Sequence, residues 1–260
     1  MRNIIFIVIL FLSFGTSAQE VKQYLLNRYF EVTTEEKEAF FVRLTQPYKE
    51  FIAYTDYDSK QRIVQTGFFT DSTFSVAVGP HKFYWEGVKL YEGVYVNGKP
   101  SGYWYFFDKK GKLSDSLHYV VNDTVNTVFK PTSNTEEKKT KALQEEHLKK
   151  DTTNPFAKVE TEAAFPGGPT AWQKHLIKNI DFPDLVMNTK RQQKSTVLIQ
   201  FVVCNDGELC SIEALNSFHP LLDLIAVNAI RKGPKWTPAI QNGRNVKAYR
   251  RQPITFVVPD

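Results

Sequence analysis

Cysteine and long apolar runs are both scarce in this sequence. The longest apolar run, Ile4–Phe14, is about a dozen residues, whereas a membrane-spanning helix needs ~20. Only two of the 260 residues are cysteine, Cys204 and Cys210. Because neither lies near the N-terminus, lipid attachment to a cysteine there is excluded.

The first eighteen residues have the anatomy of a secretory signal peptide. Arg2 supplies a positive charge, Ile4–Phe14 forms the apolar segment, and Thr16–Ala18 is a small-residue cleavage signature. We therefore expect residues 1–18 to be removed and the mature chain to lie in the periplasm. The alternative is that this segment is retained as an inner-membrane anchor.

Concentrated charge is also absent. The net charge of +5 is dispersed, with no run of lysine or arginine interleaved with aromatic residues, so nucleic-acid binding is not expected. The histidines are scattered and none pairs with another ligand at metal-binding spacing: His81, His118, His147, His175 and His219. No catalytic or phosphate-binding motif occurs. We expect no enzymatic activity, no metal and no small-molecule cofactor.

The two cysteines flank the Asn205–Gly207 turn, so the outcome depends on the register of the hairpin. An odd-numbered loop places both side chains on one face and permits a disulfide, whereas a two-residue loop places them on opposite faces. The sequence leaves both arrangements open.

Residues 19–129 are predicted to form an antiparallel β-meander. Aromatic and β-branched runs form the strand cores: 40–42, 51–54, 68–69, 83–85, 94–96, 103–107 and 119–121. Turn residues separate them at 58–59, 97–98, 110–111 and 122–123. Thr33–Glu36 is predicted to cap one short helical turn.

A weak repeat runs through this region, since Gly67–Phe69 precedes Gly93–Tyr95 by 26 positions. The stretches Tyr91–Lys99, Gly102–Tyr105 and Asp108–Leu113 resemble MORN-like repeats of the YwqK antitoxin type. The aromatic side chains of such hairpins either fill the core of a thin sheet or bind a glycan or a lipid headgroup.

Residues 130–160 read as a charged linker. Glutamate and lysine recur at helical spacing between Asn134 and Lys150, but almost no apolar face accompanies them. We expect a solvated spacer.

Residues 161–260 predict an α-β-β-α-β module. Pro169 opens an amphipathic helix that ends near Asn179, and a shorter helical piece follows from Phe182 to about Lys190. Two strands join through Asp206-Gly207, and a second helix runs from Pro220 to the Gly233-Pro234 stop signal. A last strand is predicted over 246–258. The fold class is therefore α+β, with a three-stranded antiparallel sheet and two helices in this module.

Several motifs of the module occur in a consistent order: Phe165–Gly168, Phe182-Pro183, Val197–Val203, Asp206-Gly207, Leu222-Asp223 with Ala226 and Ala229, Trp236–Ala239, Asn242-Gly243 and Pro253–Phe256. Together they resemble the TonB C-terminal domain, in a version found in Bacteroidetes-type envelope proteins.

The resemblance implies a periplasmic domain that binds the TonB box, an extended peptide of outer-membrane transporters, through β-strand addition in TonB-dependent transport. It places the peptide-binding edge on the last strand: Tyr249, Arg250, Arg251, Gln252, Ile254, Thr255, Phe256, Val257 and Val258. Isolated domains of this family exchange strands, so a homodimer is a further hypothesis.

Three features depart from that family. The glycine that usually precedes the first strand of the module is absent, and Gln193–Ser195 stands in its place. Arg250 and Gln252 occupy positions that are usually apolar, which bears on the buried face or the partner preference of the last strand. The predicted loss of residues 1–18 would also remove the anchor that an energy transducer needs. The alternative function is therefore a non-transducing envelope adaptor whose aromatic repeats bind glycan or protein.

Overall fold

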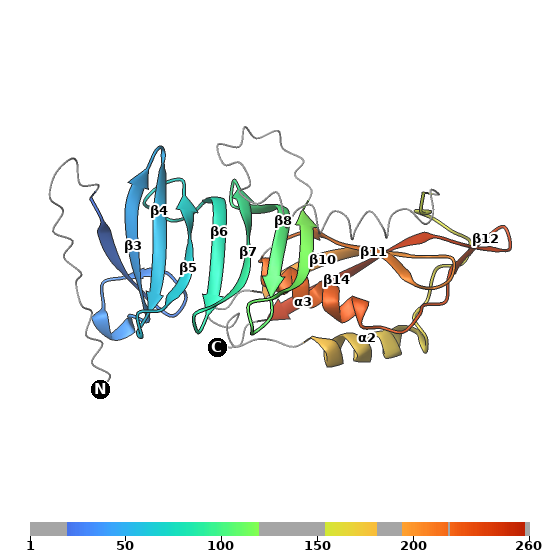
Figure 1. Ribbon diagram of the computed structural model, residues 1–260. Coiled ribbons are helices and arrows are strands. Elements are labelled where there is room, and N and C mark those ends of the chain that lie inside the picture. The colour runs from blue at the N-terminus through green and yellow to red at the C-terminus, as the bar shows by residue number, and fades with distance from the viewer. Residues whose placement is uncertain (1–19, 120–153, 181–193, 218, 258–260) are drawn as a thin grey trace.

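The computed structural model describes residues 20–119, 154–180, 194–217 and 219–257. It confirms the predicted α+β class, with a long β-meander followed by a smaller sheet that packs on two helices (Figure 1). The second helical piece expected at 182–190 and most of the linker lie outside the described residues.

The N-terminal part is one antiparallel sheet, in which the described strands follow the order β2-β1-β3-β4-β5-β6-β7-β8-β9. Apart from the pair β1–β3, strands that are neighbours in the described sheet are also neighbours along the chain. The strands are β1 (Lys22–Leu26), β2 (Val32–Thr33), β3 (Phe41–Tyr48), β4 (Phe51–Asp58), β5 (Ile63–Phe69), β6 (Ala77–Trp85), β7 (Val88–Val96), β8 (Lys99–Phe107) and β9 (Leu113–Tyr119). A 3₁₀ turn, Glu36–Glu38, stands where the short helical turn was expected.

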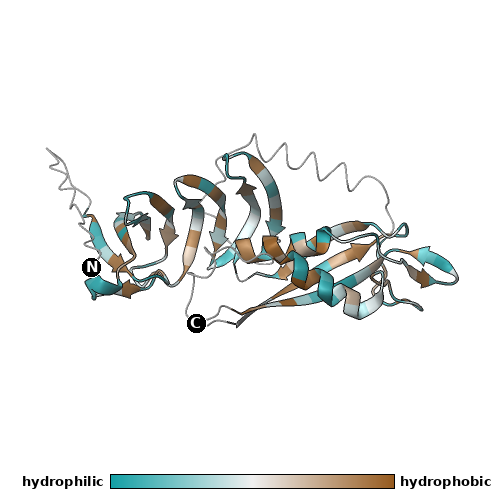
Figure 2. Ribbon diagram, turned by 90° about the horizontal axis from the view of Figure 1, so that it is seen from below, coloured by the Kyte–Doolittle hydropathy of each residue, from teal (hydrophilic) through white to brown (hydrophobic). Residues whose placement is uncertain are grey.

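One face of this sheet is lined by aromatic rings that contact each other from strand to strand. Phe83 stacks on Tyr91 with 4.3 Å between ring centroids, and Tyr95 meets Trp104 edge to face at 4.9 Å. Tyr91 and Trp104 are 2% and 0% exposed, so these two rings lie in the core of the sheet and present no face to a glycan. Both hydrophobic and hydrophilic residues occur along the strands of the meander (Figure 2).

Two glycines of the weak repeat have the same role in this core. A Cβ atom on Gly67 would lie 2.3 Å from the His81 ring, and one on Gly93 would lie 2.2 Å from the Trp104 ring. In each case the ring comes from the next strand and covers the glycine. The repeat is therefore explained by close packing of a ring against the backbone.

The C-terminal module contains a three-stranded antiparallel sheet in the order β11-β10-β14. Its elements are α2 (Gly168–Asn179), β10 (Lys194–Val203), β11 (Leu209–Asn216), α3 (Pro220–Arg231) and β14 (Ala248–Val257). Pro169 and Pro220 each stand in the first turn of a helix, as predicted. His219 caps α3, because its Nδ1 accepts a hydrogen bond from the Leu221 amide at 3.3 Å.

The final strand differs from the prediction. The continuous strand expected over 246–258 is interrupted at Lys247, and the residues before it form a separate hairpin of β12 (Ala239–Gln241) and β13 (Arg244–Val246). Asn242 and Gly243 both have positive φ at its turn, so the turn itself was predicted correctly. Three-residue strands are too short to show an alternating pattern, which is why the hairpin was missed.

The two parts of the protein share one hydrophobic core. Helix α3 packs between the three-stranded sheet and the end of the meander, and Leu222, Ala226 and Ile230 cluster with Leu117 and Trp104. Polar contacts reinforce this boundary: Tyr119 Oη donates to Asp223 Oδ2 at 2.7 Å, and Arg231 Nη1 donates to Asp115 Oδ2 at 2.8 Å.

Among the described residues, no helix has both the length and the apolar character required to cross a bilayer.

Candidate functional site

Among the strands that the structure describes, β14 has a hydrogen-bonding partner strand on one side only. It pairs with β10 in antiparallel register from Lys194↔Val257 to Val203↔Ala248, with no bulge. Because the sheet order is β11-β10-β14, the opposite side of β14 is an edge of the sheet.

The direction of the backbone groups along this edge follows from two hydrogen bonds with the backbone of Phe156. The Tyr249 amide donates to the Phe156 carbonyl at 3.1 Å, and the Phe156 amide donates to the Lys247 carbonyl at 2.8 Å. Lys247 and Tyr249 therefore point their backbone groups away from β10. Since strand geometry has a period of two, Arg251, Pro253, Thr255 and Val257 point theirs the same way.

Phe156 covers only the beginning of the edge. It makes an isolated parallel bridge to Ala248, and no other bridge to β14 from outside β10 occurs among the described residues. Phe156 belongs to the segment that was expected to be linker, so residues 154–160 in part pack on the module. The part of the edge from Arg251 to Val257 has no backbone partner within the described chain.

Pro253 divides this open part. Proline has no backbone N–H, so it lacks an outward donor, and its carbonyl accepts a hydrogen bond from Gln252 Nε2 at 2.7 Å. The Gln252 amide is held in turn by Trp172 on α2, whose Nε1 donates to Gln252 Oε1 at 2.7 Å. The outward donors are thus the amides of Arg251, Thr255 and Val257.

Both polar residues that depart from the expected apolar pattern have specific partners. The side-chain oxygen of Gln252 accepts the hydrogen bond of the Trp172 indole N–H on α2. Arg250 Nη1 forms a salt bridge with Glu162 Oε2 at 3.0 Å, and both side chains are partly exposed. These contacts explain why neither residue needs to be apolar.

The face of the sheet opposite the helices carries a polar ladder. Gln200 Nε2 donates to Glu213 Oε1 at 2.9 Å, and Arg251 Nε donates to Gln200 Oε1 at 2.9 Å. Glu213 lies on β11, Gln200 on β10 and Arg251 on β14, so the ladder crosses all three strands of the sheet. Further along, the hydroxyls of Thr196 and Thr255 are 2.9 Å apart.

The predicted edge residues divide between the two faces of β14. Ile254 and Phe256 are buried against the helices, with Arg250 and Gln252 half-buried on the same face. Tyr249, Arg251, Thr255 and Val257 are exposed on the other face, and Val258 lies outside the described residues.

Sequence reasoning missed four residues that shape the edge: Phe156, Glu162, Trp172 and Pro253. Only Pro253 carried a usable signal, because proline inside a strand pattern is confined to edge strands, bulges and strand starts. The other three are distant in sequence, and no local pattern relates them to β14.

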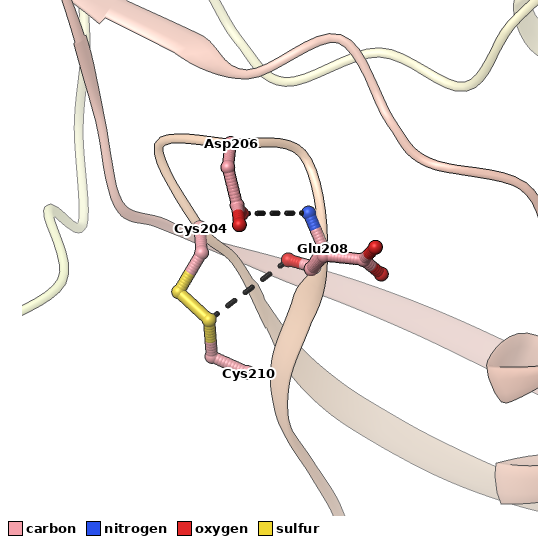
Figure 3. Close-up of a disulfide and its surroundings, with 4 residues drawn as sticks. All are labelled: Cys204, Asp206, Glu208 and Cys210. Atoms are coloured by element: carbon pink, nitrogen blue, oxygen red, sulfur yellow. Dashed lines mark hydrogen bonds between the residues drawn. A yellow bond between two sulfur atoms is a disulfide. The ribbon is translucent and has the colours of Figure 1, made fainter. Parts of the chain in front are cut away.

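Cys204 and Cys210 form a disulfide at the end of the β10–β11 hairpin (Figure 3). The turn between them is closed by the Gly207 amide, which donates to the Cys204 carbonyl at 2.9 Å, and by the Glu208 amide, which donates to Asp206 Oδ1 at 3.0 Å. Since Val203 pairs with Ala248, the disulfide lies at the end of the sheet that Phe156 covers. It is remote from the open part of the edge.

The histidines that the structure describes have structural contacts. His175 Nε2 donates to the Ala229 carbonyl at 2.9 Å and joins α2 to α3, while His219 caps α3 and lies 3.3 Å from the Tyr91 hydroxyl. Within the described ranges no group of three or more potential metal ligands comes together.

An antiparallel sheet with helices on one face and an open edge strand is an architecture that can accept an added strand. A family model described as Gram-negative bacterial TonB protein C-terminal matches residues 179–258. This range runs from the last residue of α2 to one residue beyond β14, so the C-terminal part of the chain is similar to that domain. The family is one of non-catalytic interaction domains, in keeping with the lack of a catalytic motif.

The matched range does not include the Phe165–Gly168 motif or the β-meander. The likeness of the meander to MORN-like repeats therefore stays a prediction. Comparison with curated proteins and with solved structures found no match.

Proposed function

We propose that this protein is a periplasmic TonB-like binding protein in TonB-dependent transport, and that β14 binds an extended peptide of an outer-membrane transporter by strand addition. The observation that carries the proposal is the open edge from Arg251 to Val257, whose outward amides have no backbone partner among the described residues. The match of residues 179–258 to the TonB C-terminal family supports it.

The geometry sets the register of the guest strand. Phe156 occupies the edge next to Lys247 and Tyr249, so the guest pairs with the four outward positions from Arg251 onward. Three of these offer an amide donor, and Pro253 does not. Main-chain hydrogen bonds would supply most of the affinity, as in other cases of strand addition.

A proline substitution tests the edge directly. Thr255→Pro removes an outward amide without removing a hydrogen bond to β10, because the Thr255 amide points away from that strand. Proline is tolerated at such positions, as Pro253 shows. We expect Thr255→Pro to weaken peptide binding by roughly tenfold, in line with a net value of about 1 kcal/mol for one hydrogen bond plus the disturbed pairing around it.

The matched control is Thr255→Ala, which removes the same side chain but keeps the amide. Binding of transporter peptides to the mature chain is measured by calorimetry, and the thermal midpoint of each variant reports folding. Equal affinities for Thr255→Pro and Thr255→Ala would rule out backbone addition at this edge. Pro253→Ala, which adds a donor, is expected to tighten binding.

A further inference from the structure

The polar ladder on the outer face of the C-terminal sheet has a direction. Gln200 donates to Glu213, and Arg251 donates to Gln200, so every hydrogen bond in the ladder is donated toward β11. The ladder therefore begins at the edge strand with a guanidinium, which carries five N–H donors and no acceptor. Only its Nε is used within the ladder.

Arg251 is also a positively charged residue of this edge whose guanidinium forms no salt bridge with the described residues. Its neighbour Arg250 forms a salt bridge with Glu162, whereas no carboxylate of the described residues lies within salt-bridge distance of Arg251. Glu213, the acid of the ladder, is two strands away and accepts from Gln200 instead. Arg251 is exposed, so a partner can contact it without any change in the fold.

A strand added to β14 would place one side chain directly opposite Arg251 on this face. Opposed residues of antiparallel strands have Cβ atoms about 4.5–5.5 Å apart, which is within reach of a carboxylate. The guest residue two positions further along would lie beside Pro253, whose neighbour across the sheet is Leu198. That position is apolar on both strands of the host.

We propose that Arg251 selects the guest: the peptide bound at β14 carries a carboxylate opposite Arg251 and an apolar residue two positions away on the same face. The carboxylate would accept from the free Nη groups and extend the ladder by one strand. This rests on the proposed function, since it specifies the ligand of the same edge.

A charge-swap experiment tests the selection. Three synthetic ten-residue peptides, rich in valine and threonine, differ only at one position, which is Asp, Asn or Lys. For the mature wild-type chain we expect the Asp peptide to bind roughly three- to tenfold tighter than the Asn peptide, and the Lys peptide to bind most weakly. The preference should shrink as salt is raised toward 1 M.

Arg251→Glu is expected to reverse the order so that the Lys peptide binds best, and Arg251→Gln to abolish the preference. Arg244→Glu is the matched control: it makes the same change in net charge on the exposed β13, and the wild-type order should persist. Thermal unfolding of each variant confirms that it is folded.

Two failures can be told apart. If all three peptides bind with equal affinity to the wild type and to Arg251→Glu, and Thr255→Pro still weakens them, strand addition stands and selection by Arg251 is wrong. If none of the peptides binds, or Thr255→Pro changes nothing, the proposed function itself is wrong and the selection is wrong with it.

Discussion

His81 lies among the aromatic rings of the meander and is only 2% exposed. Its Nδ1 is 3.2 Å from the Gly79 carbonyl oxygen, which can only accept, so the proton resides on Nδ1. Its Nε2 is buried without a hydrogen-bond partner among the described residues. Burial lowers the pKa of His81 to about 4, because a charged imidazolium would be poorly solvated there.

This shift predicts a loss of stability in mild acid. Between about pH 6.5 and pH 4, His81 is protonated in the unfolded chain but stays neutral in the folded chain. The free energy of unfolding therefore falls as the pH drops through this range. The loss amounts to about 3 kcal/mol when complete, from 1.36 kcal/mol per pKa unit. Urea unfolding of the mature chain at a series of pH values measures it.

The control for that measurement is the exposed His118 on β9. His81→Phe should remove most of the slope between pH 6.5 and 4, whereas His118→Gln should leave it unchanged. A slope that survives in His81→Phe would assign the acid sensitivity to other groups.

At the scale of elements, the meander depends on rings that cover glycines. Gly93 on β7 leaves room for the Trp104 ring of β8, and a Cβ atom there would lie 2.2 Å from it. We expect Gly93→Ala to destabilise the protein by roughly 1–3 kcal/mol, the usual cost of overpacking a core.

The double variant Gly93→Ala/Trp104→Leu separates a clash from a general effect on the strand. If the clash is the cause, the alanine costs much less when leucine replaces the indole, and the two substitutions are strongly non-additive in chemical denaturation. Additive losses would mean that the contact is not the reason for the glycine.

The elements themselves were largely predictable. The two helices of the C-terminal module followed from apolar spacing, from Pro169 and Pro220 at their starts and from Gly233-Pro234 after α3. The long strands of the meander followed from aromatic and β-branched runs and from the turn residues between them. The short strands β2, β12 and β13 were missed because two or three residues do not establish a period.

The candidate site was only partly predictable for the same kind of reason. The resemblance of the C-terminal motifs placed the edge on the last strand, but no motif indicated which half of that edge is open. Phe156 contacts Ala248, 92 positions further along the chain, and Trp172 contacts Gln252, 80 positions further along. Contacts between residues so far apart leave no local pattern in the sequence.

At the scale of the whole molecule, α3 ties the two parts together. Its buried residues contact both sheets, and the Tyr119–Asp223 hydrogen bond lies inside the boundary, where Ser217 also donates to Asp223. The C-terminal module therefore packs directly on the meander, and we expect the two parts to unfold together.

The shared core predicts that the two halves associate without a covalent connection. Residues 19–129 and 130–260, expressed together as separate chains, should co-purify and elute as one complex in gel filtration. Tyr119→Phe removes the buried hydrogen bond to Asp223 and should weaken the complex by about 1–3 kcal/mol. The same change at Tyr57, a half-buried residue of β4, is the control. Halves that elute separately would contradict a shared core.

The sequence by itself determined the α+β class, the meander, the two helices and the strand that ends the module, because each depends on the spacing of residues close together in the chain. The tertiary structure alone decided that Phe156 closes one part of the β14 edge, that Arg251 stands at the end of a donor ladder and that α3 is shared by both sheets. These features join residues far apart in the chain, and their contacts exist only once the sheets and helices have packed.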